Sequence, residues 1–426
     1  MVRERPLAVA FIHPDLGLGG AERLVVDAAL ELSARGHAVD MFTAHHDRRR
    51  CFEETLDGPF SVTVCGSWFP RSVCSRFTAL CAYVRCILIA IYVAWGAWRR
   101  RRQYDVIFVD QVSAVIPVLH LLTRSKVLFY CHFPDLLLVQ RRSRLRSLYR
   151  APLNRIEEVS TGCADRLLVN SNFTNETFVR TFRRLVKRDV LPGVLHPAVR
   201  VPSQTDLERV AERWREHFPA DLAHFLEGGP VFLSVNRFER KKGLDLAVRA
   251  LGVLLTQQVD AHREVASCRL AVAGGYDERL QENREVLAEL KVLVATLGLT
   301  DRVRFLPSFS EHHREGLFHT ARAVVYTPQN EHFGIVPLEA MAAARPVIAC
   351  NSGGPRESVL HGATGFLCRP DPVAVAAAMA QLTVKAAAER MGRAARSHVL
   401  RNFTRGAFGQ RLEKIVHEMV DGMSEI

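Results

Sequence analysis

The chain has 426 residues, of which 48% are hydrophobic and 24% charged, a composition typical of globular rather than disordered or fibrous proteins. Its length exceeds the size at which one hydrophobic core keeps growing, so two domains are expected. The 57 Lys and Arg residues outnumber the 45 Asp and Glu residues. The resulting formal charge of +12 favours anionic partners without choosing among nucleic acids, nucleotide-sugars and acidic lipid surfaces.

The ten cysteines contain no C-x-x-C pair and no regular framework, which argues against a zinc site and against a disulfide scaffold. Reduced thiols in a protein that faces the cytosol fit this pattern. Residues 1–13 contain an apolar run that is too short for a signal peptide, and they predict that the chain leads directly into a β-strand.

The first motif is a glycine-rich loop between a predicted strand, residues 7–12, and a predicted amphipathic helix, residues 24–32. Gly19 and Gly20 would let the backbone approach a ligand closely, and the N–H groups at the helix start suit a phosphate. The G-x-G-x-x-G fingerprint is absent because position 22 is a glutamate. A tight turn without a ligand therefore remains the alternative.

Apolar runs alternate with helical patterns through the first half, which is typical of a parallel sheet covered by helices. Further strands are predicted at residues 38–42, 61–65, 106–110, 127–131 and 166–169. The loop C-H-F-P-D, residues 131–135, should open at the carboxyl edge of this sheet, where open α/β sheets bind ligands. His132 is therefore a candidate functional residue, and a packed or capping histidine is the alternative.

One long apolar segment, residues 79–102, interrupts this alternation. Twenty of its residues would span about 30 Å as a helix, the hydrocarbon thickness of a bilayer. Arg85 interrupts the segment, whereas Trp95, Trp98 and four following arginines are typical of an interfacial anchor to anionic headgroups. The segment is expected either to associate with a membrane, as a shallow or re-entrant helix, or to pack inside a soluble domain. The basic residues 141–150 would add a second contact to the same lipid surface.

Residues 201–229 are charged and lack sustained strand patterning, so the domain boundary is placed there. The next strand–loop–helix unit carries R-F-E-R-K-K-G at residues 237–243. Arg237, just past the strand, and Lys242, at the helix entrance, can form charge-assisted hydrogen bonds to a diphosphate and stabilise a leaving nucleotide. A solvated basic turn is the alternative.

The stretch N-E-H-F-G-I-V-P-L-E-A-M, residues 330–341, predicts another strand-to-helix loop. Glu331 and Glu339 are eight residues apart, one in the loop and one about a turn into the helix, so both can face one cavity. Gly334 and Ile335 at the helix start are placed to meet an anion, while the glutamates accept hydroxyl hydrogen bonds. This combination suits a sugar joined to a phosphate. The alternative is an ordinary first-turn glutamate and a solvated loop residue.

Further strands in the second half are predicted at residues 270–273, 303–306, 323–326 and 346–349. Five motifs in this order resemble those of a retaining glycosyltransferase of the GT-B architecture. They are G-G-A-E at 19–22, C-H-F-P-D at 131–135, R-F-E-R-K-K-G at 237–243, E-H-F-G-I-V-P-L-E at 331–339 and N-S-G-G-P-R-E at 351–357. The resemblance implies an α/β fold with two Rossmann-like doubly wound domains that face a central cleft.

In more detail, C-H-F-P-D-L-L-L, A-G-G-Y-D-E-R and T-P-x-N-E-H-F-G-I-V-P-L-E-A-M resemble the dolichol-pathway mannosyltransferases that add α-1,3- and α-1,6-linked mannose. With this resemblance, residues 1–200 are expected to form an acceptor- and membrane-side domain and 230–404 a nucleotide-sugar-binding domain, joined by the linker region 201–229. Residues 405–426 are amphipathic, where relatives often carry extra hydrophobic segments, and are expected to form a helix that packs back on the first domain.

The resemblance implies transfer of mannose from GDP-mannose to a dolichol-diphosphate-linked mannosyl-chitobiose core, first α-1,3 and then α-1,6, with retention. It implies the cytosolic face of the endoplasmic reticulum membrane as the location, and it leaves open a complex with other mannosyltransferases of the pathway. GDP-mannose is a substrate, and neither a cofactor nor a metal ion is expected. No nucleic-acid partner is expected, because the cations are dispersed and no interleaved aromatic and basic motif occurs in the sequence.

Carried over to this sequence, the family pattern makes Glu331 a partner of the donor-sugar hydroxyls and Glu339 a partner of the ribose hydroxyls. His132 would touch the donor mannose beside the reacting carbon. We prefer an orienting role for Glu331 to a nucleophilic one, because phosphate is already a good leaving group. Trapping a mannosyl adduct on Glu331 would contradict that preference.

In the same pattern Arg237 and Lys242 would hold the diphosphate, helped by backbone amides at Gly19, Gly20 and near Gly334. Cations and dipoles fixed in advance lower the barrier as negative charge grows on the β-phosphate of GDP. Three alternatives stay open: another retaining GT-B glycosyltransferase with a different nucleotide-sugar donor, a nucleic-acid binder and a catalytically silent scaffold. By physics alone, the quoted loops do not choose guanine over uracil.

Overall fold

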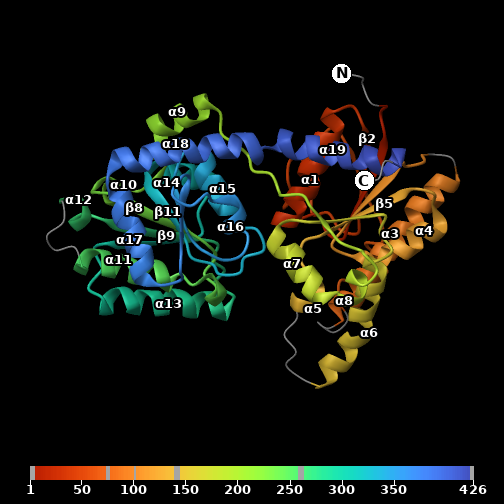
Figure 1. The fold of residues 1–426 in the computed structure, drawn as a ribbon, viewed down its shortest axis with the longest axis horizontal. Coiled ribbons are helices and arrows are strands. Elements are labelled where there is room, and N and C mark those ends of the chain that lie inside the picture. The colour runs from red at the N-terminus through yellow and green to blue at the C-terminus, as the bar shows by residue number, and fades with distance from the viewer. Residues whose placement is uncertain (1–4, 73–76, 100–101, 139–143, 258–262, 423–426) are drawn as a thin grey trace. The chain divides into compact units, whose positions relative to one another are not determined.

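The computed structural model describes residues 5–72, 77–99, 102–138, 144–257 and 263–422. The chain divides into two compact units, Met1–Ala198 with Arg405–Ile426 and Val199–Thr404. Each unit contains one parallel sheet with helices on both faces (Figure 1). The prediction of an α/β fold with two doubly wound sheets is therefore confirmed.

The first unit contains a seven-stranded sheet in the order β3-β2-β1-β4-β5-β6-β7. Its strands are β1 Ala8–His13, β2 Ala38–Thr43, β3 Ser61–Val64, β4 Val106–Asp110, β5 Lys126–Cys131, β6 Arg166–Val169 and β7 Gly193–Val194. All neighbouring strands are parallel, so their carboxyl ends share one edge. The order reverses between β1 and β4, and such a switch point is where open α/β sheets bind ligands.

Two apolar clusters cover the two faces of this sheet. One contains residues of α1 Gly20–Ala34 and α19 Arg405–Asp421, which lie side by side in Figure 1. The other contains residues of α3 Thr78–Trp98, α4 Ile116–Leu122, α6 Arg144–Thr161 and α7 Asn172–Thr181. Shorter elements complete the unit: α2 Glu54–Asp57, η1 Ser113–Val115, α5 Asp135–Leu138 and α8 Arg183–Val186.

The second unit contains a six-stranded parallel sheet in the order β10-β9-β8-β11-β12-β13. Its strands are β8 Val231–Val235, β9 Arg269–Gly274, β10 Val303–Pro307, β11 Ala321–Tyr326, β12 Val347–Cys350 and β13 Gly365–Cys368. Its switch point lies between β8 and β11. The loops after these two strands carry the cations and the carboxylates that the sequence singled out.

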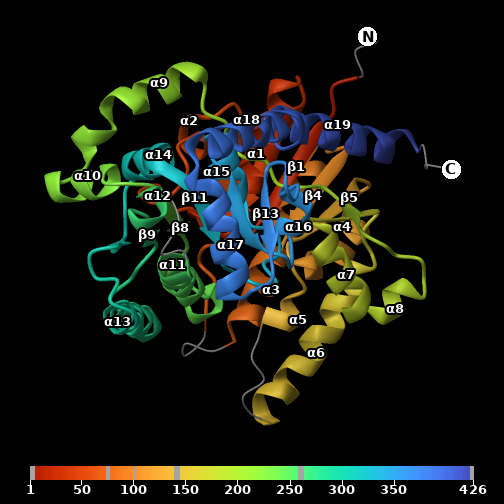
Figure 2. The ribbon, with the colours of Figure 1, turned by 60° about the vertical axis from the view of Figure 1, so that its left-hand side comes forward.

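Helices also cover both faces of the second sheet. One apolar cluster contains residues of α11 Asp245–Gln257, α13 Gln281–Thr296 and α17 Pro372–Thr383. The other contains residues of α10 Ala220–Glu227, α14 Glu311–Thr320, α15 Ile335–Ala342 and α18 Lys385–Asn402 (Figure 2). The remaining elements are α9 Gln204–Arg213, η2 Trp214–His217, η3 Arg240–Lys242, α12 Arg263–Ala266 and α16 Pro355–Ser358.

Residues 201–229, interpreted from the sequence as a linker region, contain α9, η2 and α10 and belong to the second unit. They are charged on the surface, but Trp214, Phe218 and Phe225 are buried in its core. These aromatic side chains are four and seven residues apart, a helical spacing, but they are distributed over η2, the turn that follows it and α10, so no single apolar helix face or strand pattern identified them.

Candidate functional site

Three polar side chains meet where adjacent strands of the first unit end. His13 ends β1, Asp110 ends β4, and His132 follows β5. His13 Nδ1 lies 2.8 Å from Asp110 Oδ2, and His132 Nε2 lies 2.8 Å from Asp110 Oδ1. The sequence predicted His132 alone, although His13 and Asp110 also end apolar runs at the edge where ligands bind.

His132 is held by its backbone as well as by its ring. Its carbonyl oxygen accepts a hydrogen bond of 3.0 Å from Asn170 Nδ2, and its ring lies edge-on to Tyr130 at 4.9 Å between centroids. The side chain keeps 22% of its surface exposed, whereas that of Asp110 is fully buried. His132 is thus the member of the group that a ligand can reach.

The loop after His132 is fixed by α6. Glu157 accepts hydrogen bonds from the backbone N–H groups of Asp135 and Leu136, at 2.7 and 3.2 Å. Arg150 donates to the Asp135 carboxylate at 2.6 Å. Burial, together with the charge of Asp135, raises the pKa of Glu157 to about 7, although the two backbone hydrogen bonds oppose this shift. Figure 2 shows α5 and α6 together in the lower part of the first unit.

Gly19 and Gly20 lie at the start of α1. Gly19 is the N-cap residue in an extended conformation, and Gly20 is the first helical residue. A Cβ atom added to Gly20 would meet no atom within 4 Å, so the protein's own packing does not require glycine there. An open backbone at a helix N-terminus is consistent with the predicted approach of a phosphate.

Most of the segment 79–102 lies in α3, Thr78–Trp98, which is apolar and long enough to cross a membrane by length and composition only. Arg85 is buried, and its guanidinium lies 2.9 Å from a carboxylate oxygen of Asp15. Trp95 and Trp98 are exposed. The helix therefore packs one face in the first unit and exposes aromatic residues on the other. Residues 100–101 lie outside the described residues, as do residues 141–143 of the basic stretch 141–150 and the side chains of 144–147.

In the second unit, Lys242 ends η3 and is 8% exposed. Its Nζ lies 2.5 Å from Glu331 Oε2, and its backbone carbonyl accepts a 2.7 Å hydrogen bond from Thr327 Oγ1. Arg237 is exposed and lies 2.7 Å from Glu239. The structure thus brings Lys242 and Glu331 together, while the Arg237 side chain pairs with a neighbour in its own loop.

The Glu331 loop is built against the glycine turn N-S-G-G-P. The Gly354 N–H donates to the Glu331 carbonyl at 2.9 Å, and a Cβ atom on Gly353 would lie 2.4 Å from that oxygen. Gly353 has φ +65° and Gly334, the N-cap residue of α15, has φ +83°. Both positions favour glycine, and they place the N–H groups of Ile335 and its successors at the helix start beside this loop.

Glu339 lines a cavity of about 350 Å³ bounded by residues of α9, α14 and α15. Its Oε2 lies 3.1 Å from Arg314, and Glu311, His319 and Arg345 also line the space. Burial raises the pKa of Glu339, and the charge of Arg314 opposes this. Glu331 is not among the described residues that line this cavity, so a cavity shared by the two glutamates stays a prediction.

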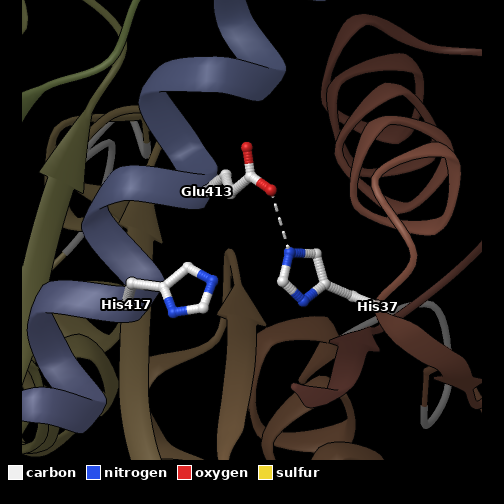
Figure 3. Close-up of side chains that lie close together, drawn as sticks. All are labelled: His37, Glu413 and His417. Atoms are coloured by element: carbon white, nitrogen blue, oxygen red, sulfur yellow. Dashed lines mark hydrogen bonds and ion pairs between the residues drawn. The ribbon is translucent and has the colours of Figure 1, made fainter. Parts of the chain in front are cut away.

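The described residues contain one group with candidate metal ligands, His37, Glu413 and His417, whose ligand atoms lie within 4.8 Å of one another. Figure 3 shows Glu413 and His417 on α19 facing His37. His37 Nδ1 accepts a hydrogen bond from the Leu7 N–H at 3.0 Å, so its Nε2 carries the proton and donates to Glu413 at 3.3 Å. A metal ion would need a lone pair on that Nε2. The geometry favours a hydrogen-bonded contact between α19 and the rest of the first unit.

Family models match both halves of the chain: Glycosyltransferase Family 4 over residues 18–199 and Glycosyl transferases group 1 over residues 221–398. Curated relatives named alpha-1,3/1,6-mannosyltransferase ALG2 are 47% identical in Mus musculus and in Homo sapiens. Each of these two matches covers 97% of this chain and 96% of the relative. The relative of that name from Saccharomyces cerevisiae is 36% identical, over 99% of this chain and 86% of its own.

Solved structures share the fold at lower identity. Sucrose-phosphate synthase from Thermosynechococcus elongatus has a TM-score of 0.73 and 23% identity, over 98% of this chain and all of the other. Anabaena Alr3699/HepE, in complex with UDP and glucose, has a TM-score of 0.66 and 18% identity, over 97% of this chain and all of the other. These likenesses show the fold alone.

Proposed function

Since this chain belongs to the alpha-1,3/1,6-mannosyltransferase ALG2 family, we propose that it transfers mannose from GDP-mannose to a dolichol-diphosphate-linked mannosyl-chitobiose core. The α-1,3 linkage is made first and the α-1,6 linkage second, both with retention. The observation that carries the proposal is the buried Lys242, paired with Glu331 beside the N-terminus of α15. A cation, a carboxylate and a helix start together suit a sugar diphosphate.

In this proposal Lys242 leaves Glu331 and pairs with the diphosphate of the donor when the donor binds. The carboxylate that is released then accepts hydrogen bonds from the donor-sugar hydroxyls. As the glycosidic C–O bond breaks, Lys242, Arg237 and the N–H groups at Gly334 and Ile335 stabilise the negative charge on the β-phosphate. No step is assigned to a metal ion.

The rest of the donor is assigned from the same logic. Glu339 accepts hydrogen bonds from the ribose hydroxyls, and the cavity that it lines receives the nucleoside. His132 contacts the donor mannose beside the reacting carbon, with the open amides at Gly19 and Gly20 near the phosphates. The acceptor hydroxyl attacks from the face that the nucleotide leaves, and the departing phosphate oxygen accepts its proton.

The proposed location is the cytosolic face of the endoplasmic reticulum membrane. The exposed face of α3, which carries Trp95 and Trp98, supports it. Arg99 lies over the Trp95 ring at 4.1 Å, so a cation accompanies the aromatic residues. Aromatic residues beside cations are typical of contacts with the headgroup layer.

The first prediction tests the donor site. The purified enzyme is incubated with GDP-mannose and a short-chain lipid-linked core trisaccharide, and the linkages formed are analysed. Lys242→Ala and Glu331→Ala should each lower kcat/KM by about 100-fold or more, because each removes a fixed contact to the reacting sugar diphosphate.

Lys241→Ala is the matched control, because Lys241 is the exposed neighbour and lies 3.2 Å from Glu239. It should retain kcat/KM within about threefold of wild type. Equal turnover by the Lys242 and Glu331 variants would remove the site assignment. Preference for UDP-glucose over GDP-mannose would favour the alternative donor.

A further inference from the structure

The group at the strand ends of the first unit contains more than the candidate residue His132. Asp110 is 1% exposed, and each of its oxygens lies 2.8 Å from an imidazole nitrogen. His13, on the far side of the carboxylate, is also 1% exposed. Of the three side chains, only that of His132 reaches the surface, so the two others act on any ligand through it.

The chemistry of the group fixes where its protons lie. An ionised carboxylate only accepts hydrogen bonds, so His13 Nδ1 carries a proton, and a proton on His132 Nε2 would face the carboxylate oxygen 2.8 Å away. The His13 contact is an aligned hydrogen bond, whereas the His132 contact is short but not aligned. With its proton on Nε2, a neutral His132 presents an unprotonated Nδ1.

The surrounding charges keep Asp110 ionised. Burial raises the pKa of Asp110, but the neighbouring imidazoles of His132 and His13 outweigh burial and lower it overall. Burial lowers the pKa of His13, but Asp110, with smaller contributions from Glu22 and Asp15, raises it overall. Among the described residues, the charge of Asp110 also acts on Tyr130, Cys131 and Cys86.

We propose that Asp110 is the positioning residue of His132, and that His13 holds the Asp110 carboxylate from the opposite side. Asp110 keeps the His132 ring in one orientation and in the tautomer protonated at Nε2. The inference rests on the proposed function, in which His132 contacts the donor sugar. His132 is the residue that touches substrate, and Asp110 acts through it.

Asparagine at position 110 tests this directly. Its side chain has one accepting oxygen and one donating NH₂ group, so it cannot accept from both imidazoles. Asp110→Asn should lower kcat by about 10- to 100-fold with KM for GDP-mannose within about threefold, because a misplaced reacting group costs rate more than binding. In a His132→Gln background the same change should cost less than about threefold, since the two residues act as one unit.

Asp27→Asn is the matched control, because Asp27 is a buried carboxylate of the same unit that pairs with Arg23. It should lower the melting temperature while kcat stays within about threefold of wild type. The proposal would be overturned if the double variant lost kcat by the product of the two single reductions. Unchanged kcat in Asp110→Asn would overturn it as well.

A measurement on the wild-type enzyme does not depend on the Asp110 variant. Long-range ¹H–¹⁵N spectra, with the His132 signals assigned by comparison with His132→Gln, report which ring nitrogen carries the proton. Protonation at Nε2 supports the proposal, and protonation at Nδ1 alone overturns it. If wild type transfers no mannose from GDP-mannose, the proposed function fails, whereas a wrong tautomer in an active enzyme defeats only the role of Asp110.

Discussion

The carboxyl group of Glu157 makes the free energy of unfolding depend on pH. It accepts hydrogen bonds from the backbone N–H groups of Asp135 and Leu136, the first residues of α5, directly after the loop that carries His132. The pKa of Glu157 is raised to about 7, so between pH 4.5 and 7 the folded protein binds a proton that the unfolded chain has released. The free energy of unfolding therefore falls as pH rises through this window.

The size of this effect can be measured by denaturant unfolding between pH 5 and 8. From the shift of the Glu157 pKa, the wild type should lose up to about 3 kcal/mol over the window, at about 1.4 kcal/mol for each pKa unit. The glutamine in Glu157→Gln cannot titrate, so the free energy of unfolding of this variant should fall less over the same pH range, by about this amount. Equal slopes in the two proteins would contradict the prediction.

The sequence predicted single residues better than pairs. His132, Lys242 and Glu331 stand in motifs that end strands, and a strand end is visible in the pattern of apolar residues. Asp110 was missed as a functional candidate because its partner His13 is 97 residues away, and an aspartate that ends a strand looks the same with or without that partner. Side-chain direction, which decides such pairs, is not encoded in spacing.

At the scale of elements, α3 has two faces with different roles. Its buried face packs within the first unit and contains Arg85. The arginine is buried among the apolar residues of this face and forms an ion pair with Asp15. Its exposed face contains Trp95 and Trp98. Composition alone left membrane association and soluble packing open, because hydropathy averages over the two faces.

Trp95→Ser with Trp98→Ser should weaken binding to vesicles that contain anionic lipid by about tenfold or more, since both tryptophans are exposed and suited to the headgroup layer. Cosedimentation with vesicles measures the bound fraction. Leu280→Ser with Val292→Ser changes two exposed apolar residues of the second unit and should leave binding unchanged. Equal loss in both double variants, or none in either, would argue against α3 as the contact.

Glu331 and Glu339 show where element prediction stops. Their spacing correctly placed one in a loop and one in a helix. The structure directs the first to Lys242 and the second to Arg314 and the α9–α14–α15 cavity. The two partners, Lys242 and Arg314, come from distant segments of the chain. The spacing of the two glutamates could therefore not reveal that they have separate partners.

At the scale of the whole molecule, the last helix belongs to the first unit. α19 packs on α1, and a Cβ atom on Gly409 would lie only 2.6 Å from Glu31 Cβ. Gly409→Ala should therefore lower the stability of the first unit by about 1–3 kcal/mol through overpacking. Gly406→Ala is the matched control in the same helix, because a Cβ atom there meets no atom within 4 Å.

Chemical denaturation followed by a probe in the first unit measures both variants. Gly406→Ala should unfold at the wild-type denaturant concentration or slightly above it, since alanine favours a helix. Gly409→Ala should unfold at a lower concentration. Identical midpoints for the two variants would mean that α19 does not press closely on α1.

Because residues 405–421 complete a unit that residues 8–194 begin, the order of synthesis matters. The ribosome delivers the seven strands and then the whole second unit, Val199–Thr404, before it delivers the helix that shields one side of the first sheet. While these residues emerge, the nascent first unit lacks Phe408, Leu412 and Val416 of α19, which complete the apolar cluster on one face of its sheet. Apolar surface that stays uncovered during translation is prone to aggregation.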